Sequence, residues 1–165
     1  MKTLQAGITL TTFVLSVTLL LPSVAFAQHE GKGNWYAFGT GGGQTGVGGV
    51  QVGGGIGYER LLYKGLGLGV EAGGYAGAEA RAVVSANGSY HFRQSASQKL
   101  VPFGTAGVSG LAGCGDGCGA TGAFNFGGGI NYWFRPHRGL RLEVRDYVFS
   151  DNAVHKWEMR IGFAF

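Results

Sequence analysis

Hydrophobic and polar side chains alternate along much of the chain, with the period of a β-strand whose two faces meet different environments. The pattern is clearest at the C-terminal end, where one face is large and apolar: Trp157, Met159, Ile161, Phe163 and Phe165. The residues between them are charged or small: Lys156, Glu158, Arg160, Gly162 and Ala164. This segment therefore predicts a strand that separates an apolar phase from a polar one.

The same alternation predicts five further strands, and two weaker patterns bring the total to eight. The clear segments are 50–59, 66–75, 82–92, 124–134 and 140–145. The weaker ones are Asn34 to Thr40, which is aromatic on both faces, and Leu100 to Leu111. In the second of these, Pro102 and the lack of a clean alternation predict a bulge or an irregular start.

The connections between these strands differ in character at the two ends. Polar or basic turns are expected at 61–65, 93–99 and 135–139. Loops are expected at the opposite end, over 41–49, 77–80, 112–121 and 150–155. Because the number of strands is even, both ends of the strand region lie on the side of the short turns.

Composition narrows the class of protein. Gly accounts for 34 of the 165 residues and charged residues for only 13%, about half the usual share. The chain has 45% hydrophobic and 13% aromatic residues, which is too many for a disordered protein, and so much Gly disfavours a helical bundle. The net charge of +4 comes from few charges of either sign and not from a basic patch, so nucleic acid is not an expected partner.

Residues 1–27 are predicted to be a cleaved signal peptide for export through the secretory pathway. Lys2 provides the positive start and an apolar run follows from Ile8 to Leu21. The small residues before the predicted cleavage site are Ala25 and Ala27. A membrane anchor is the alternative, but the run is shorter than the ~20 residues of a spanning helix. Residues 28–165 then form a single barrel domain.

The apolar faces of the strands indicate which phase surrounds the domain. They carry large side chains at almost every position, and a narrow eight-stranded barrel could not pack all of them inside. Aromatic residues gather near strand ends, as in the interfacial girdles of membrane barrels: Tyr58, Phe92, Tyr132, Phe134, Trp157 and Phe165. The prediction is an all-β fold, an eight-stranded antiparallel up-and-down transmembrane β-barrel. A soluble secreted β-protein is the alternative.

Three segments carry a resemblance to a known family. The closing residues 159–165 with their terminal Phe, the stretch 124–132 and the start Val101 to Phe103 resemble small outer-membrane β-barrel proteins of the OmpA/OmpX-like superfamily. The resemblance implies a monomer in the outer membrane, with lipid and lipopolysaccharide as partners. It also implies that the barrel-assembly machinery reads the terminal strand, through Trp157, Met159, Ile161, Phe163 and Phe165. It implies little about activity, because this fold hosts porins, adhesins, enzymes and anchors.

The polar faces of the predicted strands carry charges that point into the barrel. These are Glu59, Glu71, Arg81, His91, Arg141, Glu143, Arg145, Glu158 and Arg160. Because buried charges of opposite sign must pair, we expect a salt-bridge network. A small porin-like channel for ions or small solutes is the alternative, since the many inward glycines leave some space.

Two cysteines form the only local motif, Cys114 to Cys118 in a Gly-rich segment. In an oxidising compartment this spacing favours a disulfide that stiffens a loop tip. Free thiols remain the alternative, and a metal site is disfavoured because no further Cys or His lies nearby.

Catalysis is not expected. Some small outer-membrane barrels are lipid A deacylases or acyltransferases, which need a Ser nucleophile and a His base. The deacylase element would fall near residues 146–148, which contain neither, and His155 near Ser150 has no placed partner. The sequence thus predicts a structural or surface-interaction role without enzymatic activity, cofactor or metal.

Overall fold

The computed structural model describes residues 33–45, 47–76, 80–93, 98–114, 118–149 and 154–165. The chain divides after Glu30, and the account below concerns the second unit, Gly31–Phe165. The predicted signal peptide, with Ala25 and Ala27, lies outside the described residues.

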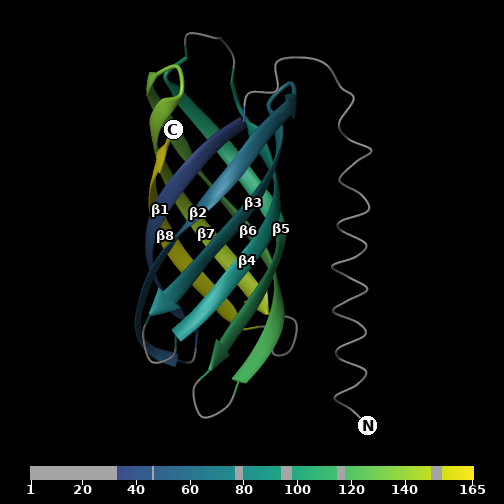
Figure 1. Cartoon of the computed structure of the whole chain (residues 1–165), viewed down its shortest axis with the longest axis vertical. Coiled ribbons are helices and arrows are strands. Elements are labelled where there is room, and N and C mark those ends of the chain that lie inside the picture. The colour runs from purple at the N-terminus through teal and green to yellow at the C-terminus, as the bar shows by residue number, and fades with distance from the viewer. Residues whose placement is uncertain (1–32, 46, 77–79, 94–97, 115–117, 150–153) are drawn as a thin grey trace. The chain divides into compact units, whose positions relative to one another are not determined.

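Eight antiparallel strands form a closed barrel, each paired with its neighbours in the chain and the last paired with the first (Figure 1). The strands are β1 (Gly33–Gln44), β2 (Val47–Tyr63), β3 (Leu66–Ala76), β4 (Ala80–His91), β5 (Leu100–Cys114), β6 (Cys118–Arg135), β7 (Arg138–Phe149) and β8 (His155–Ala164). This confirms the predicted fold class. None of the described residues belongs to a helix long and apolar enough to cross a membrane.

The strands turn their apolar faces outward and their polar faces into the barrel, as the alternation predicts. On the outer face, Phe124, Ile161 and Met159 have more than 60% of their surface exposed. On the inner face, Arg145 and Glu158 are about 1% exposed. Closing the sheet abolishes free strand edges, so every strand finds partners on both sides.

The prediction of a bulge or irregular start in β5 is wrong. Its register with β6 runs without a shift from Leu100 to Cys114, and Pro102 sits on the outer face while its carbonyl accepts a bond from Phe92 N at 2.9 Å. The alternation was hidden because several inward residues of β5 are themselves apolar, namely Val101, Phe103 and Leu111.

The predicted connections are longer than the real ones. Most of 41–49 and 112–121 is strand, and 61–65 and 135–139 shrink to the two-residue turns Lys64–Gly65 and Pro136–His137. In the first turn Lys64 and Gly65 have φ of 45° and 86°, which suits a tight hairpin. We call the end with these turns the turn end, and the opposite one the loop end.

Glycine allows the strands to continue through 41–44 because the neighbouring strand comes close. A Cβ atom at Gly42 would lie 2.1 Å from the carbonyl oxygen of Trp157 in β8. Only glycine fits there, so a segment with low strand propensity is held in the sheet by its neighbours.

Candidate functional site

The barrel interior gathers the charged residues that the sequence places on the polar faces. Glu71 of β3 lies at the centre, where its carboxylate accepts bonds from Arg145 at 2.5 Å and from Arg160 at 3.0 Å. The hydroxyl of Tyr36 donates to the same carboxylate at 2.6 Å. Glu71 thus links β3 to β1, β7 and β8.

A second carboxylate, Glu143, lies between two arginines of its own strand. Arg141 Nε is 3.1 Å and Arg145 Nε 2.6 Å from its oxygens. This follows from the two-residue period of β7, which sets residues 141, 143 and 145 side by side on the inner face. The cross-strand partner of Glu143 is Arg160, which adds a positive charge from β8.

The network continues toward both ends of the barrel. At the turn end, Glu59 meets Arg141 at 3.3 Å, Ser89 Oγ at 2.5 Å and His91 Nε2 at 3.2 Å. Toward the loop end, Glu158 accepts a bond from Arg160 Nε and another from Tyr147.

The eight predicted network residues therefore form one connected set: Glu59, Glu71, His91, Arg141, Glu143, Arg145, Glu158 and Arg160. Lys156, whose Nζ lies 3.9 Å from Glu158, joins them. With Lys156, the four carboxylates face four positive side chains, so the formal charges cancel. Arg81, the ninth inward charge, lies half-buried on β4.

Aromatic rings occupy the space beside the inward glycines. A Cβ atom at Gly57 would lie 2.4 Å from the ring of Tyr36, one at Gly55 2.9 Å from the ring of Phe38, and one at Gly53 2.8 Å from the ring of Tyr75. At these positions the glycines make room for neighbouring side chains and do not widen the lumen. At these three positions, inward glycine does not support a channel.

The same rings cover the arginines. The guanidinium of Arg141 lies 3.9 Å from the ring centre of Phe103, and that of Arg160 lies 4.4 Å from the ring centre of Phe38. Such cation–π contacts gain strength when water is excluded. The charged network is thus embedded in aromatic side chains.

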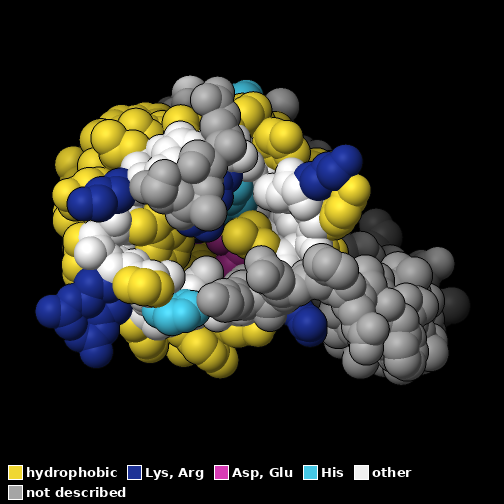
Figure 2. Space-filling view, turned by 90° about the horizontal axis from the view of Figure 1, so that it is seen from above, with side chains coloured by type: hydrophobic (Ala, Val, Ile, Leu, Met, Phe, Trp, Pro, Cys, Tyr) yellow, Lys and Arg dark blue, Asp and Glu magenta, His cyan; other side chains and the backbone are white. Residues whose placement is uncertain are grey.

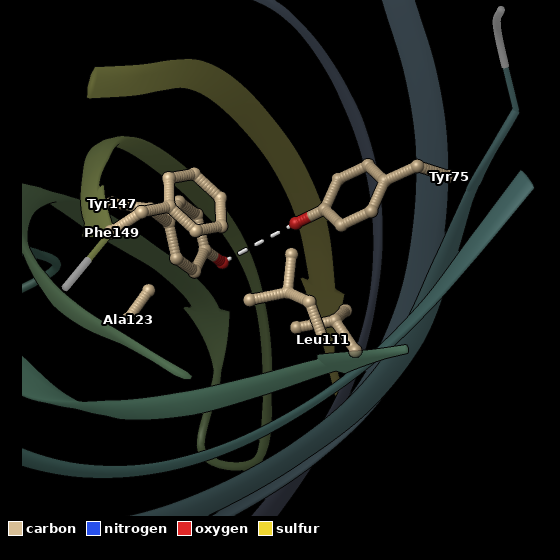
Figure 3. Packing of buried hydrophobic residues seen from close by; sticks show 6 residues of the cluster. Tyr75, Leu111, Ala123, Tyr147 and Phe149 are labelled. Atoms are coloured by element: carbon tan, nitrogen blue, oxygen red, sulfur yellow. Dashed lines mark hydrogen bonds between the residues drawn. The ribbon is translucent and has the colours of Figure 1, made fainter. Parts of the chain in front are cut away.

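An apolar cluster fills the interior near the loop end (Figure 3). It consists of Tyr75, Val83, Leu111, Ala123, Tyr147 and Phe149, with Val154 packed against it. Tyr75 reaches across to Tyr147, with 3.3 Å between the hydroxyl oxygens, and Tyr147 is fully buried. Lys156 Nζ lies 2.9 Å from the ring centre of Tyr75. The cluster fills part of the lumen on the loop-end side of the charges.

The sequence did not single out the tyrosines of this interior. Tyr36, Tyr75 and Tyr147 all point inward and bond to charged or phenolic groups. Their odd or even position along each strand was the available signal for the inner face. Tyrosine also suits a membrane interface, so the residue type alone does not show whether the side chain points inward or outward.

The predicted assembly residues lie on the outer face of β8. Trp157, Met159, Ile161, Phe163 and Phe165 are between 41% and 63% exposed. Phe165 exchanges backbone hydrogen bonds with Trp35 of β1, at 2.8 and 3.2 Å. Their reading by the assembly machinery stays a prediction.

Cys114 is the last residue of β5 and Cys118 is the first residue of β6. Cys114 and Cys118 are cross-strand partners, and Cys118 is disulfide-bonded. The residues between them lie outside the described part. Within the described residues, no three His, Cys, Asp or Glu side chains are grouped as metal ligands.

His155, considered above as a catalytic base, stands on the outer face. It lies 2.6 Å from Asp146 of β7, and Ser150 is outside the described residues. The two side chains form a hydrogen bond at the barrel surface.

Solved structures share this barrel. The N-terminal β-barrel domain of Pseudomonas aeruginosa OprF superposes with a TM-score of 0.63 at 18% identity, covering 82% of this chain and 100% of that one. Neisserial surface protein A gives 0.62 at 14% identity, over 80% and 94% of the two chains. A de novo designed transmembrane β-barrel gives 0.54 at 18% identity, over 85% and 100%.

These likenesses show the fold, and they confirm at that level the resemblance to small outer-membrane β-barrels. No protein-family model matches the sequence, and no curated protein sequence matches it.

Proposed function

We propose that this protein is an integral outer-membrane barrel with a closed interior, which serves a structural or surface-interaction role without catalysis. The observation that carries the proposal is the inversion of the two faces. The outer face is apolar and the interior holds charges that pair with one another.

The outer face supports a lipid environment. Its exposed apolar side chains come from every strand, among them Trp35, Ile56, Leu68, Val84 and Phe126. Soluble monomers rarely expose contiguous apolar patches of more than a few hundred Å², whereas lipid needs no cover for such a surface. Seen from the turn end, apolar side chains surround the barrel (Figure 2).

The topology suits the usual orientation of such barrels. β1 starts and β8 ends at the turn end, where two connections are two-residue turns. In outer-membrane barrels the short turns face the periplasm and the longer loops face outward. We propose the same orientation here, with export by the signal peptide, assembly through β8, and lipid and lipopolysaccharide as surroundings.

Membrane fractionation combined with gel mobility tests the location and the barrel together. The protein should appear in the outer-membrane fraction, and its mobility should change on boiling because a closed barrel resists unfolding in detergent. Recovery in the periplasm, or a mobility unaffected by boiling, would contradict the proposal.

Planar-bilayer recordings test the closed interior. The paired charges and the Tyr75–Tyr147 contact fill the lumen, so we expect no steady conductance from the folded protein. The doubly substituted Tyr75→Ala, Tyr147→Ala barrel is the comparison, since it removes the largest rings of the apolar cluster. Stable channels in the unmodified protein would favour the porin-like function.

A further inference from the structure

Among the described residues, six arginine and lysine side chains stand exposed at the turn end, although they are scattered along the sequence. One is Arg93, and the other five, which we call the basic rim, are Arg60, Lys64, Lys99, Arg135 and Arg138. They come from the β2–β3 turn, the β4–β5 connection and the β6–β7 turn, which barrel closure brings to one end. The sequence predicted basic turns at one end of the barrel, and the fold adds Arg60 of β2 and places these turns around that end.

Among the described residues, no Asp or Glu side chain forms an ion pair with the basic rim. Four of the described carboxylates, those of Glu59, Glu71, Glu143 and Glu158, point into the lumen. The fifth, Asp146, pairs with His155 nearer the loop end. The positive charge of the rim is therefore presented outward, without an ion pair inside the described part of the chain.

The rim also borders the lipid-facing surface. Arg60 follows Tyr58 on the outer face of β2, and Arg138 precedes Leu140 on the outer face of β7. The ring of Tyr58 packs at a tilt against that of Trp35, with ring centres 5.1 Å apart. Aromatic rings prefer the level of the lipid headgroups, and long basic side chains beside them extend toward the phosphates.

The loop end carries no equivalent set in the described residues. Lys156 is buried in the lumen, Arg81 is half-buried on the inner face, and His155 pairs with Asp146. The two ends of the barrel thus differ in the charge that they offer to the two leaflets.

We propose that the basic rim binds anionic phospholipid headgroups in the leaflet at the turn end. Its charges stand apart around the circumference (Figure 2), an arrangement that suits several small headgroups better than one extended polyanion. Each exposed Lys or Arg near such a surface attracts it, with an effect that salt screens. The inference rests on the proposed membrane location.

The three tryptophans make the test possible, because Trp35 lies at the turn end beside Tyr58 and Trp157 lies toward the loop end of β8. One variant retains only Trp35, through Trp133→Phe and Trp157→Phe. Another retains only Trp157, through Trp35→Phe and Trp133→Phe. Each is folded into mixed vesicles of phosphatidylglycerol and phosphatidylcholine in which one of the two lipids carries brominated chains, which quench nearby tryptophan.

We expect Trp35 to report phosphatidylglycerol enriched about two- to fivefold over its bulk share, and Trp157 to report no enrichment. Changing the rim to Gln at all five positions should abolish the enrichment at Trp35, as should high salt. The charge-preserving variant Arg60→Lys, Arg135→Lys, Arg138→Lys is the matched control and should retain it.

Three outcomes would overturn the inference in different ways. Equal quenching of Trp35 by both brominated lipids would leave the barrel in the membrane but show that the rim does not select anionic lipid. The absence of quenching by either lipid would show that the outer face does not meet acyl chains, and would refute the proposed function as well. Enrichment that survives the Gln variant would assign the selectivity to something other than the rim.

Discussion

At the scale of single residues, glycines inside the barrel leave space that tyrosine rings occupy. Gly57 of β2 faces the ring of Tyr36 on β1, and its missing side chain lets the Tyr36 hydroxyl reach Glu71. Gly39 of β1, by contrast, has no atom within 4 Å of the position where a Cβ would be built. The two glycines therefore offer a matched pair of sites with opposite expectations.

Gly57→Ala should destabilise the barrel by about 1–3 kcal/mol, because the new methyl group overlaps the ring of Tyr36. Gly39→Ala should change the free energy of unfolding by no more than about 0.5 kcal/mol. Equilibrium urea unfolding in lipid vesicles measures both. Equal effects at the two sites would mean that the ring of Tyr36 does not depend on the space at Gly57.

Glu71→Leu should cost about 3–5 kcal/mol, because Arg145 and Arg160 lose a carboxylate inside the barrel. The double variant Glu71→Leu, Arg160→Leu should recover part of this loss, since Arg145 keeps Glu143 and the net charge is restored. The same unfolding measurement applies. A double variant less stable than the single one would contradict the pairing of Glu71 with Arg160.

At the scale of the strand, β8 closes the barrel against β1. The register runs from Tyr36 opposite Ala164 to Gln44 opposite Lys156, and the backbone bonds of Phe165 to Trp35 extend it by one residue. The outer face of β8 is apolar and its inner face is charged. This strand therefore contributes to the apolar outer surface and also closes the barrel.

Ile161→Arg should impair assembly, with a cost of about 2–4 kcal/mol for a basic residue on the lipid face near the midplane. Ile161→Val keeps the apolar face and should leave the level of folded protein unchanged. The heat-modifiable band on a gel reports both variants. If the Arg variant assembled as well as the Val variant, Ile161 would not face lipid.

Deleting Phe165 should lower the amount of folded protein in the outer membrane and increase degraded material in the periplasm, since the terminal aromatic residue is the expected assembly signal. Phe165→Tyr preserves the ring and serves as the control. Quantitative immunoblots of cell fractions measure the effect. Unchanged levels after deletion would remove Phe165 from the signal.

Much of the strand order could be predicted from the sequence. The alternation of polar and apolar side chains shows which residues of a strand face a polar interior and which face apolar surroundings. β8 and β7 were predicted with their faces, as their inner residues are charged. The regularity of β5 was not, because Val101, Phe103 and Leu111 are apolar yet point inward, where they pack beside the network and the apolar cluster. Alternation by polarity fails wherever the lumen is itself apolar.

The lengths of the strands depended on contacts that no local pattern contains. Gly42 continues β1 only because β8 lies against it. The charge network was predictable in membership, since its residues share the inner face, but Tyr36, Tyr75 and Tyr147 were missed as members. Which acid meets which base depends on which strands face each other across the lumen, as with Glu71 of β3 and Arg160 of β8.

At the scale of the whole molecule, the arrangement of ends predicts which connections reach the outside of the cell. Counting from β8, the connection between β5 and β6 lies at the loop end. With the proposed orientation, Cys114 and Cys118 stand on the cell surface, and Cys118 is disulfide-bonded.

Intact cells should show no labelling by a membrane-impermeant maleimide until a reductant is added, after which both cysteines should label. Labelling without reductant would indicate free thiols. Failure to label after reduction would place the loop end in the periplasm and reverse the proposed orientation. A Cys114→Ser, Cys118→Ser variant provides the background.

The ladder between β1 and β8 differs from the others in the time at which it can form. In the described barrel, the other seven ladders join consecutive strands and can form as hairpins, whereas this one needs Trp35 and Phe165 to meet. Long-range pairing of this kind is slow, because the chain must be brought together before any contact stabilises it. Until this ladder forms, a sheet of the eight strands has two unpaired edges, which can add a strand from another chain. The interval before β1 meets β8 is therefore the one in which the barrel is most exposed to aggregation.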